Sequence, residues 1–559
     1  MSDIGGHTLT QKLARSRWAA LKSERLSWDS DWREISDYLL PRAGRFMTSD
    51  RNKGGRRNNN IKDSTATKAH GTCAAGMMAG MTSPARAWYR LTTSDPDLDE
   101  STNVKLWLAD VRRLMLMVMH KSNTYRALHS IYEEVSGFGT GASILLSDFK
   151  DVIRHYPLTT GEYCIATSER GEVNTLYREF DMTVAGMVGK FSLKKVSDSV
   201  RTLYNSGKLD QWVTVIHAIE PRSDRDTRKR DAVNMAWSSV YFEAACKEDQ
   251  FLSESGFKRF PAVCPRWKTR GGDIYGESPG LDTLGDIKQL QHQQLRKAQA
   301  IDYQTMPALQ IPVSMKTNQL DTLPGGATYV DTSSPGGGIR TAFEVQLNIR
   351  DLAADMQEVR ERINGNFYAD LFLMLANGSN TSMTATEVAE RHEEKLLMLG
   401  PVVERLGDEL LSPLIEMTFD RLNEAGLIPP APPELQGREL NVEFVSMLAQ
   451  AQKAVDTNSI DRYLSTLGVV YQLKPDVLDK LDTDKLADEY ADMLGIDPNL
   501  IVPGDRVALV RQQRAEAAQA QAQMQAAQQV ATTARDLSSA NTERPSALTN
   551  VIDMFSGYS

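Results

Sequence analysis

The stretch ANGSNTSMTATEVAERHEE (residues 376–394) separates two of the strongest helical patterns in the sequence. Upstream of it, apolar side chains recur at helical spacing, at Leu352, Met356, Val359, Ile363, Phe367, Leu371 and Leu375. Downstream, a second helical pattern runs from residue 385 to about residue 424, and Thr384 with Glu387 has the spacing of a capping box. The small polar residues between the two helices have almost nothing to bury, so we expect a bare loop there.

The helix upstream of this loop is one arm of a predicted hairpin. Residues 281–303 form another helical pattern, and the Pro- and Gly-rich insert PALQIPVSMKTNQLDTLPGGATYVDTSSPGGGI (residues 307–339) separates it from the helix of residues 345–375. The insert contains short β-like runs. Two long helices joined by a compact β insert predict a hairpin that projects from the body of the protein.

The C-terminal third is expected to be helical. Pro401 and Pro413 should kink or divide the helix that follows the bare loop. Residues 440–500 have the pattern of a small helical unit, and residues 476–497 within it contain eight acidic residues and two lysines. Residues 506–537 predict an Ala/Gln-rich helix with too little apolar surface to fold alone, although it could pack against copies of itself. The residues from Ser538 onward are expected to be disordered.

The N-terminal half predicts a mixed body, which makes the expected class α+β, mainly α. Helical patterns cover residues 9–40, the small apolar residues 62–82, and about 102–136. Between GFGTGASILL (residues 137–146) and about residue 265, short β-like runs alternate with turns. The charged segment DRDTRKRD (residues 224–231) between two such runs is interpreted as a solvated hairpin tip.

A basic loop follows the first helix. It is rich in Gly and Asn and contains six basic residues against one acidic residue, at Arg42, Arg45, Arg51, Lys53, Arg56 and Arg57. Two interpretations stay open for it. The loop is either simply solvated, or it contacts phosphates or docks a partner.

Bulk properties restrict the class of protein. A chain of 559 residues is too long for one core, and its 41% hydrophobic and 25% charged residues are ordinary for a globular protein. No apolar run is long enough for a transmembrane helix, and the N-terminus lacks the apolar core of a signal peptide, so we expect folding in a cytoplasm. The four cysteines have no pairing or metal-binding spacing and are expected to be reduced and mostly buried. A net charge of −9 argues against tight, indiscriminate binding of nucleic acid.

No catalytic or cofactor-binding motif is convincing. GESPG (residues 276–280) matches the nucleophile-elbow pattern, but Pro279 has no N–H for an oxyanion hole, and no strand precedes Ser278. GFGTG (residues 137–141) follows a helix and precedes a strand, which is the reverse of a dinucleotide-binding loop. The histidines, His392 included, do not cluster at metal-ligand spacing. We therefore expect a protein without cofactor or metal that positions other molecules and does not transform them.

Several stretches in the same order resemble the portal, or head-to-tail connector, family of short-tailed bacteriophages. They are SWDSDWREISDYLLPRAGRF, GMMAGMTSPARAWYRL, GFGTGASILL, FPAVCPRWKTRGGDIYGESPGLDTLGDIKQL and, most specifically, MTATEVAERHEEKLLMLGPVVERLGDELLSPLIEMTFDRL. The resemblance covers roughly residues 10–430. Further toward the C-terminus it rests on position and composition alone.

The resemblance implies a portal fold with a defined order of parts. The parts are an N-terminal helix (1–41), a wing (42–280), a first stem helix (281–305), a clip (306–344), a second stem helix (345–375), a tunnel loop (376–384), a long kinked helix (385–429), a helical crown (430–502), a barrel helix (503–537) and a disordered tail (538–559). It also implies a ring of about a dozen copies, a dodecamer, at one vertex of the capsid.

The partners and location of the protein are implied by the same resemblance. Portals conduct double-stranded DNA during packaging and ejection, and nucleate procapsid assembly with capsid and scaffolding proteins. They dock the terminase large subunit and later the tail adaptor proteins. The chain is therefore expected in the virion, assembled in the host cytoplasm, with no membrane partner.

The resemblance also directs attention to three sets of residues. The tunnel loop would contain Asn377, Gly378, Ser379, Asn380, Thr381, Ser382 and Met383. The clip would offer docking residues at Lys316, Pro324, Gly325, Gly326, Pro335 and Arg340. The cations Lys288, Arg296, Lys297, Arg350, Arg360 and Arg362 on the stem helices could face DNA and contact phosphates without reading sequence.

Alternatives remain for each of these interpretations. The stem cations could pair with acids of neighbouring subunits, and the tunnel loop could be an ordinary surface turn. The whole chain could instead be another phage structural protein, such as a tail adaptor or a scaffold-like helical protein. A monomeric hydrolase built around Ser278 is a third, more remote reading of the same sequence.

Overall fold

The computed structural model describes residues 10–46, 60–95, 98, 101–229, 231–246, 250–311, 313, 339–341, 348–377, 398–435, 440–444, 463–468, 481–487, 502 and 504–538. The chain forms two units. One comprises Met1–Pro96 with Trp107–Ile460, and the other comprises Asp97–Leu106 with Asp461–Ser559. Among the described residues helices predominate and the sheets are antiparallel, in agreement with the predicted class.

The first unit contains a five-stranded antiparallel sheet. Its strand order follows the sequence, from β4 (Tyr163–Thr167) through β5 (Val173–Thr183), β6 (Trp212–Pro221) and β7 (Trp237–Glu243) to β8 (Ser253–Phe257). Helix α1 (Gln11–Tyr38) covers one face, where Trp18 stacks on Tyr177 with ring centroids 6.2 Å apart. Part of the other face is covered by α6 (Val184–Phe191) and α7 (Asp198–Asn205) through a cluster of apolar residues.

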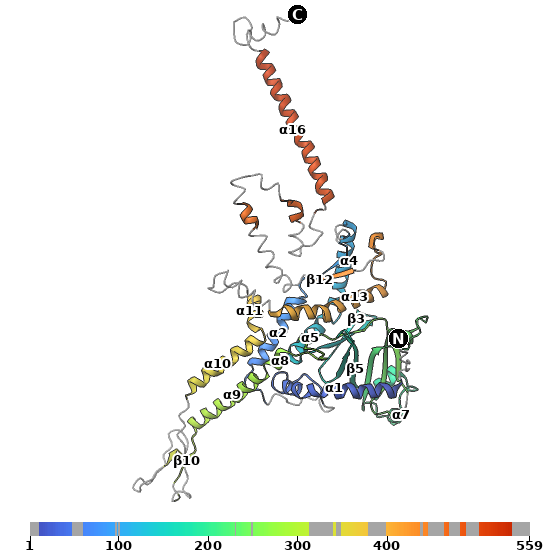
Figure 1. Ribbon diagram of the computed structural model, residues 1–559, viewed down its shortest axis with the longest axis vertical. Helices are drawn as coiled ribbons and strands as arrows, with labels where there is room; N and C mark the ends of the chain where they lie inside the picture. Colours follow the sequence, from blue (N-terminus) through green and yellow to red (C-terminus); the bar gives the residue numbers. More distant parts are fainter. Residues whose placement is uncertain are drawn as a thin grey trace. The chain divides into compact units, whose positions relative to one another are not determined.

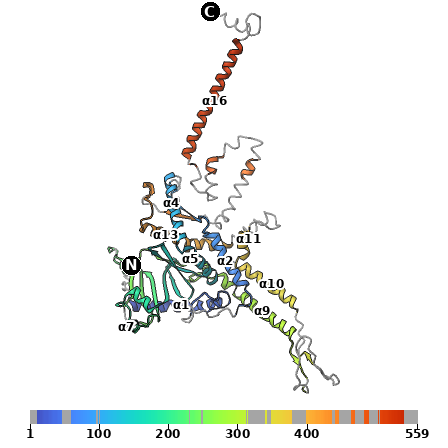
Figure 2. The same ribbon diagram turned by 180° about the vertical axis from the view of Figure 1, so that it is seen from behind.

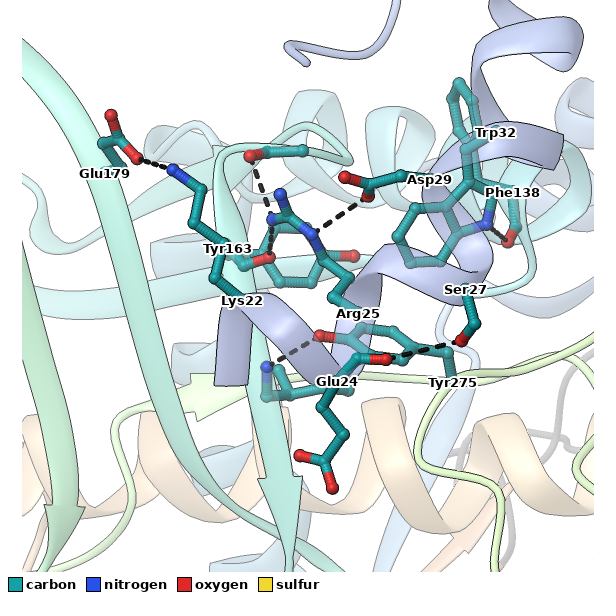
Figure 3. Close-up of polar contacts among 12 residues, drawn as sticks. Lys22, Glu24, Arg25, Ser27, Asp29, Trp32, Phe138, Tyr163, Glu179 and Tyr275 are labelled. Atoms are coloured by element: carbon teal, nitrogen blue, oxygen red, sulfur yellow. Dashed lines mark hydrogen bonds and ion pairs between the residues drawn. The ribbon is translucent and has the colours of Figure 1, made fainter. Parts of the chain in front are cut away.

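The buried arginine of α1 fixes this helix on the sheet. The Arg25 side chain is 2% exposed and donates hydrogen bonds to the carbonyl oxygens of Gly161 (3.0 Å) and Tyr163 (2.7 Å). It also pairs with Asp29 at 3.1 Å, one helical turn later. Figure 3 shows the guanidinium among these three acceptors. Because every charged or polar group in the set has a partner, the burial of this charge is compensated.

A three-stranded sheet of β2 (Ala142–Asp148), β3 (Val152–Leu158) and β9 (Ala262–Val263) follows α4 (Thr102–Lys121) and α5 (Thr124–Phe138). The GFGTG segment links α5 to β2, as predicted. Gly139 ends the helix with φ +87° in the left-handed region, and a Cβ there would overlap the carbonyl oxygen of Gly276. The glycine is therefore needed for helix termination and close backbone packing.

Helix α2 (Thr65–Met81) lies at the centre of the helical part and contacts α5, α10 and α11. Its small residues permit close approach, since Gly76 faces Phe372 of α11 without room for a Cβ. Cys73, Cys164 and Cys264 are buried and Cys246 is partly exposed, and all four are free thiols, as predicted. Among the described helices, none is long and apolar enough to cross a membrane.

The hairpin predicted between residues 281 and 375 is present. Helix α8 (Pro279–Asp282) leads into α9 (Leu284–Thr305), and α10 (Ile349–Asn366) packs against α9. Strand β10 (Leu309–Gln310) pairs with β11 (Arg340–Thr341) near the far end. Figures 1 and 2 show α9 and α10 side by side, extending away from the sheets.

The expected single helix over 345–375 is divided. α10 ends at Asn366, and α11 (Ala369–Asn377) begins after Tyr368, which has φ +54°. Phe367 is fully buried against His70, and Tyr368 lies beside Trp267. Because these two neighbouring rings pack against different parts of the protein, tertiary packing interrupts a periodic pattern that continues through the break.

The helix after the bare loop differs from the prediction. Helical turns run through Pro401 over residues 398–406 without a break. The irregularity lies at Gly407–Leu411, a π-helical turn directly before α13 (Ser412–Glu424), where Pro413 occupies the first turn. Pro413 has no backbone N–H and cannot donate the hydrogen bond of an ordinary α-helical turn. The wider π-helical turn lies directly before this position.

The interpretation of residues 440–500 as wholly helical is wrong at its start. Residues 440–444 form β12 (Leu440–Phe444), which pairs antiparallel with β1 (Tyr89–Thr93), with Leu91 opposite Val442. Its sequence, LNVEF, alternates apolar and polar residues, which is the period of a strand. The distant partner strand decides between the two conformations.

The described part of the second unit is helical. Helix α16 (Gly504–Ser538) is 35 residues long, which confirms the helix predicted at 506–537. Its Arg511 makes a two-fold ion pair with Asp484, at 2.5 and 2.7 Å. Leu509, Val510 and Met524 of α16 are 58%, 40% and 69% exposed in the single chain.

Candidate functional site

The candidate site is the helical hairpin of α9, α10, β10 and β11 with the elements at its base. Apolar side chains of both helices are fully buried where the hairpin joins the body, at Ile287, Leu290, Met356, Val359 and Ile363. Further out, Leu295, Ile301 and Tyr303 of α9 are 39%, 41% and 58% exposed. The base is thus a packed core, whereas the projecting part leaves apolar surface for another molecule to cover.

A buried polar cluster connects the base of the hairpin to α2. Gln291 of α9 accepts a hydrogen bond from Asp63 N (2.8 Å) and donates one to Asp63 O (2.8 Å). Arg360 of α10 pairs with the Asp63 carboxylate at 2.7 Å. Burial alone would raise the pKa of Asp63, but hydrogen bonds from Thr65 and Arg360 outweigh it and hold the pKa below its ordinary value.

Three of the six stem cations have acidic partners within the chain. Lys288 pairs with Glu34 of α1, Arg360 pairs with Asp63, and Arg362 pairs with Asp286 (3.2 Å) and Glu358 (3.0 Å). These pairs connect α9 and α10 to each other and to the body. Each of these three cations therefore already has an ion pair within its own chain.

The other three cations have no acidic partner among the residues that the structure describes. Arg296 and Arg350 are exposed and Lys297 is half-buried. Within the described part of the chain, the side-chain hydrogen bonds of Arg296 go to neutral neighbours on its own helix, His292 at 3.4 Å and Gln299 at 3.2 Å. Arg296, Lys297 and Arg350 are thus the charges of the set that remain available to an anion.

The far end of the hairpin carries exposed apolar residues that the sequence analysis did not single out. Met306, Leu309, Ile311 and Val313 are 80%, 40%, 40% and 88% exposed. Arg340, predicted as a docking residue, lies in β11 opposite Gln310. The other predicted docking residues lie outside the described residues, at Lys316, Pro324, Gly325, Gly326 and Pro335.

The predicted tunnel loop begins where α11 ends. Asn377 is the last residue of α11. The remaining predicted loop residues, Gly378, Ser379, Asn380, Thr381, Ser382 and Met383, lie outside the described part of the chain, as do His392 and most of the basic loop.

Ser278 has a structural function. Its side chain is fully buried, accepts a hydrogen bond from Leu281 N (3.1 Å) as the N-cap of α8, and donates one to Gly137 O (2.8 Å). Within the described residues, no group of His, Cys, Asp and Glu side chains could hold a metal ion. The hairpin instead offers exposed apolar and cationic side chains, which are features of a contact surface.

The family model described as "Bacteriophage head to tail connecting protein" matches residues 11–502. The chain belongs to this bacteriophage family. A probable portal protein of Bordetella phage BPP-1 is 62% identical over 548 residues, covering 98% of this chain and 99% of the relative. A portal protein of Salmonella phage epsilon15 is 44% identical over 534 residues, covering 95% and 96%. The family is structural, and the function of this chain is that of a portal at the connection between head and tail.

A solved structure of the neck of an empty gene transfer agent particle aligns over 78% of this chain and 94% of its own. The two chains are 9% identical, with a TM-score of 0.35. The family membership rests on the family model and the two relatives.

Proposed function

We propose that about a dozen copies of this chain form a closed ring at one capsid vertex, through which double-stranded DNA is packaged and ejected. The relationship to two portal proteins over nearly the whole length carries this proposal. The hairpin supports it, because exposed apolar residues along α9 would be covered by a neighbouring copy. The ring would nucleate procapsid assembly in the host cytoplasm, with capsid and scaffolding proteins.

In this proposal α9 and α10 are the stem, residues 306–344 are the clip and residues 376–384 are the tunnel loop. Residues 42–280, with the five-stranded sheet, are the wing, and α16 is the barrel helix. The exposed apolar residues around β10 would dock the terminase large subunit during packaging and tail adaptor proteins afterwards.

The three cations without an acidic partner among the described residues are our candidates for DNA contact. An overall acidic protein with a few spaced cations guides DNA, because a densely basic channel would retain it by counterion release. Contacts from Arg296, Lys297 and Arg350 would go to phosphates and ignore sequence. Lys288, Arg360 and Arg362 would instead maintain the stem, because each pairs with an acid of its own chain.

Neutralising the three candidate cations tests this assignment. Rings of Arg296→Gln/Lys297→Gln/Arg350→Gln are expected to assemble normally and to bind short duplexes more weakly, with a shallower salt dependence that is the same for all sequences. The matched control replaces Arg225, Arg228 and Lys229, between β6 and β7, with glutamine. It removes the same charges, two arginines and one lysine, at a different place. Equal losses of DNA binding in the two triple variants would overturn the assignment.

The tunnel loop has its own test. Replacing residues 377–381 with bulky side chains is expected to impair packaging or retention of DNA while leaving ring assembly intact, because the loop would narrow the channel. Normal packaging and retention by the substituted ring would contradict a tunnel position for this segment.

A further inference from the structure

A cationic cluster lies on the sheet face opposite α1, away from the hairpin. We define the cationic cluster as Arg178 of β5, His217 of β6, Tyr241 of β7, Lys190 of α6 and Tyr156 of β3. Arg178, His217 and Tyr241 are directly opposite one another across three adjacent strands. Figure 1 shows the neighbouring α7 at the side of the sheet remote from α9 and α10.

The arginine of the cluster is buried without a carboxylate. Arg178 is 9% exposed, and its guanidinium lies between the rings of Phe180 (4.7 Å) and Tyr156 (5.9 Å). Its Nε donates a hydrogen bond to Nδ1 of His217 at 3.2 Å. Among the described residues, Arg178 has no acidic partner, whereas the buried Arg25 on the other face pairs with Asp29. A buried charge without a counter-ion is costly, and an incoming anion would compensate it.

The histidine adds no charge of its own. Because Nδ1 of His217 accepts from Arg178, the ring carries its proton on Nε2, which donates to Ser239 Oγ at 2.9 Å. Burial, with the nearby charges of Arg178 and Lys190, holds the pKa of His217 well below its ordinary value. The ring stacks on Tyr241 with centroids 3.9 Å apart, so the two rings form a fixed platform.

Lys190 supplies the second charge at the other end of the row. Its ammonium lies 4.5 Å from the ring centroid of Tyr241 and 5.2 Å from that of Phe191. Burial and the charge of Arg178 lower the pKa of Lys190, and no described acid offsets them. Arg154 lies two residues before Tyr156 on the exposed face of β3, which extends the positive surface.

A carboxylate on this face near the cluster has another function. Glu243, two residues after Tyr241, is 5% exposed and accepts hydrogen bonds from Ser197 N (2.8 Å) and Ser197 Oγ (2.6 Å) at the start of α7. It is therefore held at the helix terminus. The cationic cluster itself contains only positive and neutral groups.

We propose that the cationic cluster binds an acidic segment of a partner protein, with Arg178 and Lys190 each contacting a carboxylate. Arg178 donates to His217, and Lys190 lies over the Tyr241 ring stacked on that histidine, so an acidic segment could place one carboxylate at each cation. The planar guanidinium matches a carboxylate in two-fold geometry, and the exposed ring of Tyr156 would pack on the aliphatic parts of the segment. Its distance from the hairpin argues against DNA in the channel as the ligand.

Binding of a fluorescein-labelled hexaglutamate peptide to the full-length protein tests the proposal by fluorescence anisotropy. Lys190→Gln is expected to weaken binding about tenfold, and Lys190→Glu to remove it. Arg178→Lys keeps the charge but loses the two parallel N–H donors of the guanidinium. Binding is therefore expected to weaken although the protein remains folded. The matched control, Lys194→Gln, removes an exposed lysine nearby that lies outside the cationic cluster and is expected to have little effect.

Two competitors distinguish the class of ligand. Unlabelled hexaglutamate is expected to displace the probe, and hexaglutamine is not. Equal weakening by Lys190→Gln and Lys194→Gln would overturn the proposal, because it would show non-specific attraction. Displacement by a short DNA duplex at lower concentration than by hexaglutamate would also overturn it, in favour of a phosphate site.

Discussion

Single residues of this protein show how far a sequence predicts contacts. The sequence argued against catalysis by Ser278, since Pro279 follows it, and the structure shows Ser278 as a helix cap. It did not predict that Lys288, Arg360 and Arg362 pair within their own chain, because Glu34, Asp63 and Asp286 belong to other elements. Nor did it predict the buried Arg25 and Arg178, since arginine on an amphipathic pattern is ordinarily expected at the surface.

The contacts of Arg25 lead to the first prediction. Arg25→Ala is expected to lower the free energy of unfolding of the first unit by about 3 kcal/mol, because Asp29 and two carbonyl groups would lose their partner in a buried site. The measurement is the urea midpoint followed by tryptophan fluorescence. Lys22→Ala, in the same helix, breaks the half-exposed pair with Glu179 and is expected to cost under about 1 kcal/mol. Equal effects of the two substitutions would contradict the account of Arg25.

Glu134 of α5 leads to a prediction about pH. Burial raises its pKa to about 7, although hydrogen bonds from Thr159 and Thr160 oppose the shift. The unfolded chain has the ordinary value of 4.5, so between about pH 4.5 and 7 the folded protein holds a proton that the unfolded chain has released. The contribution of Glu134 to stability is therefore fully present below pH 4.5 and is lost as pH rises through 7, by about 3 kcal/mol.

The variant Glu134→Gln isolates this effect. The buried His70 and His155, with pKa values lowered to about 4, act in the opposite direction and destabilise the fold as pH falls below 6.5. They are the same in both proteins, so the difference in urea midpoint between wild type and variant reports Glu134. We expect the variant to gain stability relative to wild type between pH 5 and 8, and parallel curves would contradict the raised pKa.

At the scale of elements, local patterns predict helices better than their boundaries. The helices corresponding to α1, α2, α9 and α16 were all expected from apolar spacing or composition. The break at Tyr368 and the strand β12 were not, because each depends on contacts with distant parts of the chain. Periodicity describes which face of an element is apolar, and the packing partner decides where that element ends.

The contact between α2 and α11 can be tested with two glycines of one helix. A Cβ at Gly76 would overlap the Phe372 ring, so Gly76→Ala is expected to displace α11 and destabilise the first unit by about 2 kcal/mol. A Cβ at Gly71 meets nothing within 4 Å, so Gly71→Ala is expected to stabilise by about 0.5–1 kcal/mol through helix propensity. Thermal unfolding of the two variants provides the measurement. The same direction of change in both would contradict the close packing.

At the scale of the whole molecule, the ordered motifs of the sequence predicted the family, and the relatives confirm it. Association of copies could not be derived from one chain, yet the structure leaves surfaces that need covering. Leu295, Ile301 and Tyr303 of α9 are exposed, and so are Leu509, Val510 and Met524 of α16. Both helices gain stability if they pack against neighbouring copies, because neither can bury these side chains alone.

The oligomeric state of the purified full-length chain tests the central claim most directly. Native mass spectrometry, with cryo-electron microscopy of the same sample, is expected to show a closed ring of about a dozen copies, with α9 and α10 of every copy around a central hole. A protein that stays monomeric or dimeric at every salt concentration would contradict the portal ring.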